Sequence, residues 1–548
     1  MKQNRWVLVG IAAALTLWVV GTSNLVGCSS NKVQSALPTP VCGWTAPTTE
    51  SLQTCGAGDP TLPPEPTLPT DAQTCMTIAA THDTPDEAQA AADTKAVQTA
   101  LTSAACKGKA VRLVASADGQ NHAFVTGSLL ISSTTLWVDQ GVTLYASRNP
   151  KYYQSDGNCG LTGVSDSNAC LPLLQINGTS PGLVGDGVID GQGGEPLYQQ
   201  AYSWWDLSNA LRASNGSGPN PALVEVKKAT GFVMYRITLH NSPKFHIKLQ
   251  SVSPSTTLDD MGFPSCTTPG AGFIVWGITI LTPAVLETST GFRPNPYYSR
   301  NTDGIDPGEF GQTNCGVIAC SNVSTGDDMV ALKAAHGLRD IVVAHDHFGS
   351  GHGMSLGSET NGGATNIDVH DLTIDGDSRW NGAPASDTGD FNGVRVKSDE
   401  SRGGLVDNIN FTDVCIRDVL NPIVIDSSYN PLYGYTPVAD GGVPATIPIF
   451  KSITLTNVRN VMCMALAPGL VVMQGYNGAY AAGPITLNNV IIDGITPLDV
   501  ATQGANIVLG PGNVNFTPVA SNTVTVMNNI SGESTPMPCT FPPLPVPK

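Results

Sequence analysis

Charged side chains are scarce in this chain, and basic ones are the scarcest. Asp, Glu, Lys and Arg make up 13% of the 548 residues, so long exposed helices are not expected. Only 27 residues are basic against 44 acidic ones, which gives a net charge of −17. The sequence therefore supplies no basic face for nucleic acid or for an anionic membrane. The same balance disfavours a polyanionic substrate, unless cations are concentrated locally.

Long apolar runs and metal-type cysteine spacings are scarce as well. An apolar run at 6–20 follows Lys2 and Arg5 and is short for a membrane span, so it predicts an export signal. Residues 25–29 (LVGCS) resemble a bacterial lipobox. We therefore expect 1–27 to be a lipoprotein-type signal peptide and Cys28 to be lipidated; the alternative is an ordinary cleaved signal with an incidental cysteine. No CxxC repeats occur, which disfavours a structural zinc site.

Glycine, proline and cysteine are plentiful. The 58 Gly and 40 Pro residues indicate many short strands joined by turns. With Cys28 set aside, twelve of the 13 Cys remain, an even number that favours disulfides formed in an oxidising compartment. The spacings predict the pairs Cys75–Cys106, Cys159–Cys170 and Cys315–Cys320, and a small loop closed by Cys42 and Cys55.

Two regions follow the signal in our interpretation, a tether and a domain that opens with a helix. Residues 28–72 form a Pro/Thr-rich tether without a core of its own. Residues 85–105 have an apolar side and suit a capping helix. The catalytic domain covers 73–548, where similar apolar segments recur at 341–343, 367–369, 409–411, 453–455 and 485–487. This recurrence predicts an all-β parallel β-helix; a β-sandwich or a propeller is the rival, and a propeller would show longer units with aromatic signatures.

Four polar clusters interrupt the apolar pattern: NTDG at 301–304, GDD at 326–328, GHG at 351–353 and RVK at 395–397. The spacing from Asp303 to Asp327 and Asp328 is close to one coil, so stacking would place these carboxylates about 4.8 Å apart between backbones. Three carboxylates that close raise the pKa of one of them, and a protonated carboxyl beside an ionised one suits glycoside hydrolysis. Gly326 permits the turn that both Asp side chains need. The alternative is a loop whose Asp residues bind backbone or calcium.

A histidine and two cations complete the candidate site. The glycines beside His352 let the backbone approach a substrate; the alternative is a histidine without a functional role. Arg395 and Lys397 are two apart on a strand, so they share a face and suit sugar carboxylates; they could instead form a surface pair or be partners for the Asp cluster. His345 and His347 also alternate on a strand, but no third ligand is evident, so we predict no metal and no cofactor.

In this order, the four clusters resemble the signature motifs of the polygalacturonases, the family 28 glycoside hydrolases. Residues 187–194 (GVIDGQGG), 203–205 (SWW) and 421–426 (NPIVID) extend the similarity, which spans about 75–500 and is greatest to secreted bacterial endo-acting members. The resemblance implies a right-handed single-stranded parallel β-helix. It also implies inverting, endo-acting hydrolysis of the α-1,4-galacturonosyl linkages of pectate (homogalacturonan).

Three competing hypotheses for the function stay open. Inserts near 251–270 and 284–300 could close one end of a cleft and make the enzyme exo-acting. A pectate lyase would share the β-helix and the substrate but would eliminate with calcium. A non-catalytic carbohydrate-binding surface protein would keep the β-helix without needing the carboxylate cluster.

The resemblance also assigns roles to single residues. Asp327 is expected to be the general acid, Asp303 and Asp328 to position and deprotonate water, and His352 to tune the protonation of the acid. The galacturonate would be held by Asn301, Arg395, Lys397 and Tyr429. Polygalacturonate is then the partner. We expect an exported monomer, either secreted or anchored to the outer membrane by the lipid alone.

Overall fold

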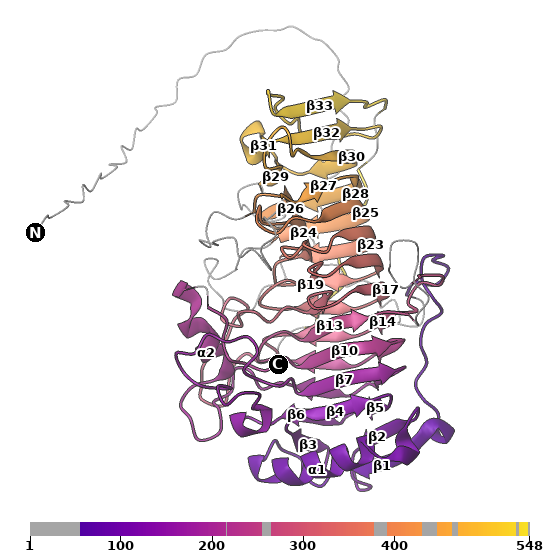
Figure 1. The fold of residues 1–548 in the computed structure, drawn as a ribbon, viewed down its shortest axis with the longest axis vertical. Coiled ribbons are helices and arrows are strands. Elements are labelled where there is room, and N and C mark those ends of the chain that lie inside the picture. The colour runs from indigo at the N-terminus through magenta and orange to yellow at the C-terminus, as the bar shows by residue number, and fades with distance from the viewer. Residues whose placement is uncertain are drawn as a thin grey trace, which may run out of the picture. The chain divides into compact units, whose positions relative to one another are not determined.

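The computed structural model describes residues 55–214, 216–254, 265–376, 392–429, 447–462, 470–532 and 536–545, all of which belong to one compact unit. Short strands stack in parallel, each pairing with its equivalents in the coils before and after it (Figure 1). For the described residues, the predicted parallel β-helix is confirmed. Both expected inserts fall partly or wholly within these ranges, and Cys28 and Cys42 lie outside them.

Sheet B carries the strands that position the site. Its eleven strands in the described ranges are β4 (Leu129–Ser132), β7 (Leu174–Thr179), β10 (Val224–Thr230), β13 (Ile247–Val252), β16 (Ile305–Pro307), β19 (Val330–Leu332), β22 (Met354–Leu356), β24 (Asn392–Lys397), β26 (Asn421–Asp426), β29 (Val471–Gln474) and β31 (Val500–Gln503).

Sheet A is built from two strands per coil in the N-terminal part and from longer strands further on. The first strands of its coils are β1 (Thr74–Ala79), β2 (Ala110–Val114), β5 (Thr135–Val138), β8 (Gly182–Val184), β11 (Phe232–Tyr235), β14 (Phe273–Trp276), β17 (Thr313–Ala319) and β20 (Leu338–Ala344). The second strands are β3 (Ala123–Thr126), β6 (Thr143–Ala146), β9 (Val188–Asp190), β12 (Thr238–His240), β15 (Thr279–Leu281), β18 (Asn322–Ser324) and β21 (His347–Phe348). The later strands are β23 (Ala364–Asp375), β25 (Leu405–Arg417), β27 (Ile449–Phe450), β28 (Ile453–Val461), β30 (Ala482–Ile492), β32 (Ala505–Leu509) and β33 (Val524–Asn528).

Apolar side chains stack inside the coils in register. In sheet B, equivalent positions of successive coils are Ile305, Val330, Met354, Val394 and Ile423, each at most 2% exposed. Burial of such a side chain contributes roughly 1.5–3 kcal/mol. Because each coil covers the apolar face of the one before it, the repeated apolar segments of the sequence form one continuous core.

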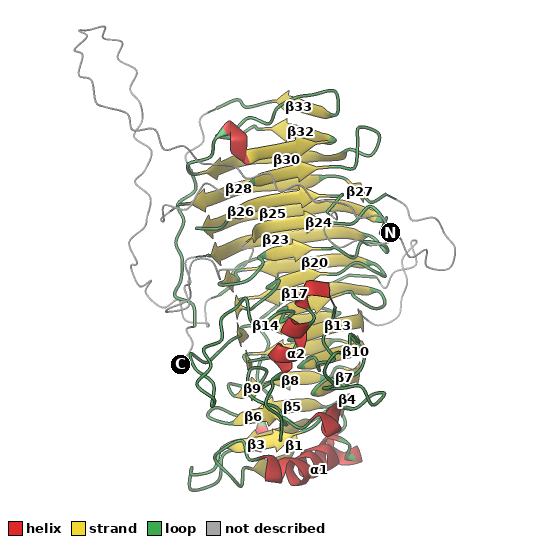
Figure 2. Cartoon of the chain, turned by 90° about the vertical axis from the view of Figure 1, so that its left-hand side faces the viewer, coloured by secondary structure: helices red, strands yellow, loops and turns green. Residues whose placement is uncertain are grey.

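A helix closes the N-terminal end of this core. Helix α1 (Ala90–Leu101) follows a short 3-10 turn (Glu87–Gln89), where the Asp86 carboxylate accepts a hydrogen bond from the Ala88 N–H (2.9 Å). Its buried side chains join the core cluster, and the helix lies below the first coils in Figures 1 and 2. The expected capping helix is confirmed. The second α-helix of the described residues, α2 (Trp204–Ala210), lies beside the stack, and no described helix has the length and apolarity to cross a membrane.

Two of the predicted disulfides are confirmed. The described residues contain the bonds Cys75–Cys106, Cys159–Cys170, Cys55–Cys320, Cys266–Cys315 and Cys415–Cys539. Disulfides of this number indicate that the chain folds in an oxidising compartment.

The predicted bond between Cys315 and Cys320 is wrong. Cys315 lies within β17 and Cys320 directly after it, and five residues of extended chain span about 16 Å, which exceeds the reach of a disulfide. Cys315 is instead bonded to Cys266, and Cys320 is bonded to Cys55. The predicted loop closed by Cys42 and Cys55 is therefore wrong too.

Residues 55–72, which we call the strap, lie against the outer face of sheet A (Figure 1). Leu62 and Leu68 pack against a row of buried side chains from successive coils, which includes Trp137, Tyr235 and Trp276. The Tyr235 hydroxyl donates a hydrogen bond to the Glu65 carboxylate (2.7 Å). The strap is thus part of the folded body, unlike the core-free tether expected for 28–72.

Candidate active site

The candidate site occupies one turn of the coil, where the chain passes from sheet A to sheet B. Asp303, Asp328 and His352 each lie two residues before the start of a strand, namely β16, β19 and β22. The first residues of these strands pair with one another across successive coils. The three residues therefore occupy the same place on three successive coils, about 4.8 Å apart between backbones. This is the stacking that the sequence spacing predicted.

Asp327 and Asp328 both reach this row because they lie in a turn and not in a strand. The Asp327 Oδ1 atom lies 2.9 Å from His352 Nδ1 and accepts a hydrogen bond from the Asp328 N–H at 3.0 Å. The Asp327 side chain is 19% exposed and that of Asp328 only 2%. Asp327 is thus the carboxylate of this pair that a ligand could reach.

Gly326 serves a different purpose from the one predicted. Its φ angle is not in the left-handed region, so the turn itself does not require glycine. A Cβ atom at this position would instead lie 2.2 Å from the Ser299 carbonyl oxygen and 2.4 Å from that of Pro296. Glycine is needed here because the segment 296–299 packs directly on the turn that carries Asp327.

Replacing Gly326 with alanine is therefore expected to move the Asp327 turn or the segment 296–299. We expect stability to fall by about 1–3 kcal/mol, as for other overpacked sites. Turnover should fall by about 10²-fold, the cost of a 1 Å misplacement of a catalytic group. Thermal unfolding and initial rates on the polymeric substrate measure both effects. Gly532→Ala is the control, because a Cβ there meets nothing within 4 Å. Equal behaviour of the two variants would contradict the packing argument.

The glycines beside His352 also pack against protein. A Cβ at Gly351 would lie 2.5 Å from the Asp327 carbonyl oxygen, and one at Gly353 would lie 2.1 Å from that of Gly393. The prediction that these glycines leave room for substrate is therefore wrong. They allow neighbouring coils to approach, so that the His352 N–H donates to the Asp327 carbonyl at 2.8 Å.

Arg395 and Lys397 lie on one face of β24, as predicted, and both reach Asp328. The Arg395 guanidinium and the Ser355 hydroxyl (2.9 Å) donate to Asp328 Oδ1, and Lys397 donates to Oδ2 (3.2 Å). The Tyr429 ring centre lies 5.3 Å from Lys397 Nζ and 5.9 Å from Arg395 Cζ. The predicted cations and the tyrosine are thus brought together around one buried carboxylate, a possibility that the sequence left open for the cations.

The three carboxyl groups of Asp303, Asp327 and Asp328 differ in pKa. Burial raises the pKa of Asp303 well above its usual value, and the negative charges of Asp327 and Asp306 add to this effect. One carboxyl with a raised pKa is what the sequence spacing predicted.

The pKa values of the other two carboxyl groups are lowered. Burial opposes ionisation of Asp328, but the charges of Arg395 and Lys397 outweigh burial and keep its pKa below the usual value. Burial also opposes ionisation of Asp327, and there the charge and hydrogen bond of His352 lower the pKa. The site therefore combines one carboxyl group whose pKa is raised with two whose pKa is lowered, a difference that acid/base cleavage can use.

Comparison with known proteins agrees with this geometry. The profile of the glycosyl hydrolases family 28 matches residues 126–508. The chain belongs to this family. A polygalacturonase of Ralstonia nicotianae is 36% identical over 86% of this chain and 87% of its own length. An endo-polygalacturonase of Pectobacterium carotovorum is 34% identical over 74% of this chain and 85% of its own. A solved polygalacturonase from Erwinia carotovora superposes with a TM-score of 0.59 at 30% identity, covering 84% of this chain and 98% of that one.

This family 28 glycoside hydrolase has charged site residues that the sequence analysis missed. Lys333, after β19, places its Nζ atom 3.8 Å from Asp303 Oδ2 and 3.6 Å from Glu359 Oε2. Asp306, on β16, is buried, and burial raises its pKa well above the usual value. The available signal for Lys333 was a lone cation at the end of the apolar run 329–332.

Asn301 lies two residues before Asp303 with a φ of 59°. Asparagine tolerates this left-handed conformation better than most side chains, so the residue helps to form the turn that presents Asp303. Its contact with substrate stays a prediction.

A metal ion beside Asp327, Asp328 and His352 would have to compete with two protein cations. Ligand atoms of Asp327, Asp328 and His352 lie within 4.8 Å of one another. Asp328, however, is already bonded to Arg395 and Lys397. A second group of this kind in the described residues, Asp59 with His345 and His370, lies on another corner of the coil.

The predicted shared face of His345 and His347 is wrong. His345 has a φ of 57° and forms a corner between β20 and β21, so strand alternation does not extend across it. The His347 ring instead lies beside the next coil, with Nδ1 2.9 Å from Thr373 Oγ1.

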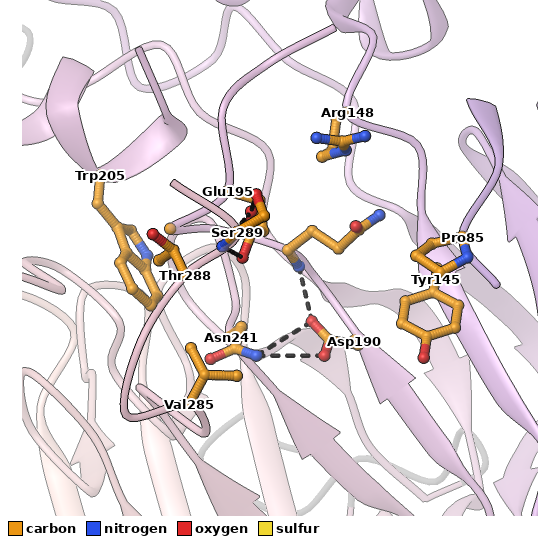
Figure 3. Close-up of a pocket in the computed structure, with 12 residues that line it drawn as sticks. Pro85, Tyr145, Arg148, Asp190, Glu195, Trp205, Asn241, Val285, Thr288 and Ser289 are labelled. Carbon is orange, nitrogen blue, oxygen red and sulfur yellow. Dashed lines mark hydrogen bonds between the residues drawn. The ribbon is translucent and has the colours of Figure 1, made fainter. Parts of the chain in front are cut away.

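A cavity of about 350 Å³ lies in the same row of turns, on earlier coils (Figure 3). Asp190, the last residue of β9, accepts hydrogen bonds from the Gln192 N–H (2.8 Å) and from Asn241 Nδ2 (3.2 Å). Glu195 accepts one from the Ser289 N–H at 3.0 Å, so the expected insert at 284–300 forms one wall. The cavity is lined by Pro85, Tyr145, Arg148, Asp190, Gln192, Gly194, Glu195, Trp205, Asn241, Val285, Thr288 and Ser289.

Proposed function

We propose that this family 28 enzyme is a polygalacturonase that hydrolyses the α-1,4-galacturonosyl linkages of pectate by endo cleavage with inversion. The observation that carries the proposal is the row of Asp303, Asp327 and Asp328 beside Arg395 and Lys397. A carboxyl and carboxylates suit cleavage of a glycosidic bond, and adjacent cations suit a sugar that carries a carboxylate. The bacterial relatives, a polygalacturonase and an endo-polygalacturonase, support the same substrate and, for the second, the endo mode.

Each residue has a role in this proposal. Asp327 is the most exposed of the three carboxyl groups and protonates the leaving oxygen, and His352, which is hydrogen-bonded to it, tunes its protonation. Asp303 and Asp328 position and deprotonate the water. The raised pKa of Asp303 makes this residue the competing candidate for the acid.

Substrate binding depends on the local cations, because protein and substrate repel at long range. Arg395, Lys397 and Tyr429, with Asn301 at the neighbouring turn, hold the galacturonate at the cleavage point. Arg395 and Lys397 already neutralise Asp328, so a substrate carboxylate shares them with that residue. Activity is expected to favour mildly acidic pH, where the carboxyl groups are partly protonated and one of them can act as the acid, and a rate that keeps rising above neutrality would contradict this.

The products formed from polygalacturonate test the proposal. Endo hydrolysis predicts new reducing ends, a mixture of oligomers and an early fall in viscosity, without an unsaturated, ultraviolet-absorbing product. Release of monomer or dimer alone from the start would indicate exo action. Unsaturated products that depend on calcium would indicate a lyase, and binding without turnover would indicate a carbohydrate-binding protein.

We also propose that the enzyme is an exported monomer that is lipidated at Cys28, which lies outside the described residues. The disulfides support export. Replacing Cys28 with serine is expected to move the enzyme from the membrane fraction to the medium. Recovery of the wild-type enzyme itself in the medium would indicate ordinary secretion.

A further inference from the structure

Two imidazoles and one carboxylate converge where the strap meets the β-helix. Asp59 Oδ2 lies 2.9 Å from His345 Nε2 and 2.7 Å from His370 Nε2. These three ligand atoms all lie within 4.8 Å of one another. The residues come from the strap, from the corner between β20 and β21, and from β23, so only the folded chain brings them together. This corner differs from the turn that carries His352.

Both histidines are oriented by a second carboxylate. The Nδ1 atom of His345 lies 2.5 Å from Asp371 Oδ2, and that of His370 lies 3.3 Å from Asp368 Oδ2. Histidines that bind a metal through one ring nitrogen commonly donate the other N–H to a carboxylate, which fixes the tautomer and increases the basicity of the ligand. Both rings therefore have the outer partners of a metal site and direct Nε2 at a common point.

The carboxylate is oriented in the same way. The Thr61 N–H (2.8 Å) and hydroxyl (2.7 Å) both donate to Asp59 Oδ1. This leaves Oδ2 directed at the two imidazoles. The disulfide from Cys55 to Cys320 holds the strap four residues away, so the three ligands are positioned before any ion binds.

We propose that Asp59, His345 and His370 bind a divalent transition-metal ion of the zinc class, which fastens the strap to the β-helix. Two imidazoles and one carboxylate suit zinc, and three protein ligands leave a fourth position for water. Because the ligands come from distant parts of the chain, binding stabilises the folded state. The site is structural and independent of the proposed hydrolysis.

Zinc binding to the full enzyme, first stripped with a chelator, tests this inference. Titration with ZnCl₂ followed by metal analysis is expected to give one zinc per chain and a higher melting temperature. Asp59→Asn and His370→Ala should each lower the affinity by at least about 100-fold, since outer partners alone are worth about 10–100-fold. Neither variant should show the zinc-dependent rise in melting temperature, and circular dichroism shows that each is folded.

Two further variants make the result specific. His347→Ala removes a neighbouring histidine that contacts Thr373 outside the cluster, and it should bind zinc like the wild type. His352→Ala removes the histidine that contacts Asp327 in the proposed active site, and it should also leave this zinc in place. Absence of bound zinc in the wild type would overturn the inference, and so would loss of zinc in His352→Ala with retention in His370→Ala. The cluster would then be a hydrogen-bonded contact of the strap alone.

Discussion

Replacing Asp327 with asparagine is expected to slow the hydrolysis of polygalacturonate by about 10²–10⁴-fold, the usual contribution of a general acid. Asparagine keeps the shape of the side chain but has no proton to give to the leaving oxygen. The side chain is partly exposed and hydrogen-bonded to His352, so the fold should tolerate the change. Initial rates of reducing-end release measure the loss, and an unchanged melting temperature serves as the control.

A substrate with a better leaving group then separates the roles of the carboxyl groups. A para-nitrophenyl oligogalacturonide needs little protonation, so Asp327→Asn should cleave it within about 10-fold of the wild-type rate. Asp303→Asn should stay slow on both substrates, because activation of water is needed for each. If the para-nitrophenyl substrate instead restored the rate of Asp303→Asn and not that of Asp327→Asn, the general acid would be Asp303, in line with its raised pKa.

Replacing Arg395 with methionine is expected to lower the free energy of unfolding by about 3–5 kcal/mol, the cost of removing one partner of a buried ion pair. The Asp328 carboxylate would then keep Lys397 and Ser355 but lose its largest neutralising charge. Activity should fall as well, since the same guanidinium faces the substrate in the proposed site. Urea unfolding at neutral pH measures the stability. Arg236→Met, which removes a half-exposed pair with Asp186, should cost no more than about 1 kcal/mol.

The same variant should change how stability depends on acid. The folded state lowers the pKa of Asp328, so this residue stabilises the wild type above the pKa of an unfolded Asp, about 3.9. That contribution is lost as the pH falls and Asp328 takes up a proton. Without Arg395 the pKa of Asp328 rises, so protonation of Asp328 costs the variant less stability than it costs the wild type. The stability difference between the two proteins should therefore shrink below about pH 4. A difference that is constant with pH would show that Asp328 is not the partner that matters.

Repetition made much of the fold predictable from the sequence. Each coil packs only on its neighbours, so the apolar segments at 341–343 and 367–369 had to pair if any β-helix formed. The spacing of Asp303 and Asp328 equals one coil, and that alone stacks them. Arg395 and Lys397 share a face because side chains alternate along a strand.

Contacts that cross many coils could not be read in this way. The pairing of Cys55 with Cys320, the packing of the strap and the meeting of Asp59 with His370 join residues hundreds of positions apart. The left-handed corner at His345 was also hidden, because no glycine marks it.

By itself, the sequence determined the architecture and the set of side chains at the candidate site, because both follow from a repeat length and from strand alternation. The tertiary structure decided which carboxyl group has the raised pKa, what Arg395 and Lys397 neutralise and why residue 326 is glycine. Those outcomes depend on burial and on the distances between side chains, which are fixed only when the coils and the strap pack together.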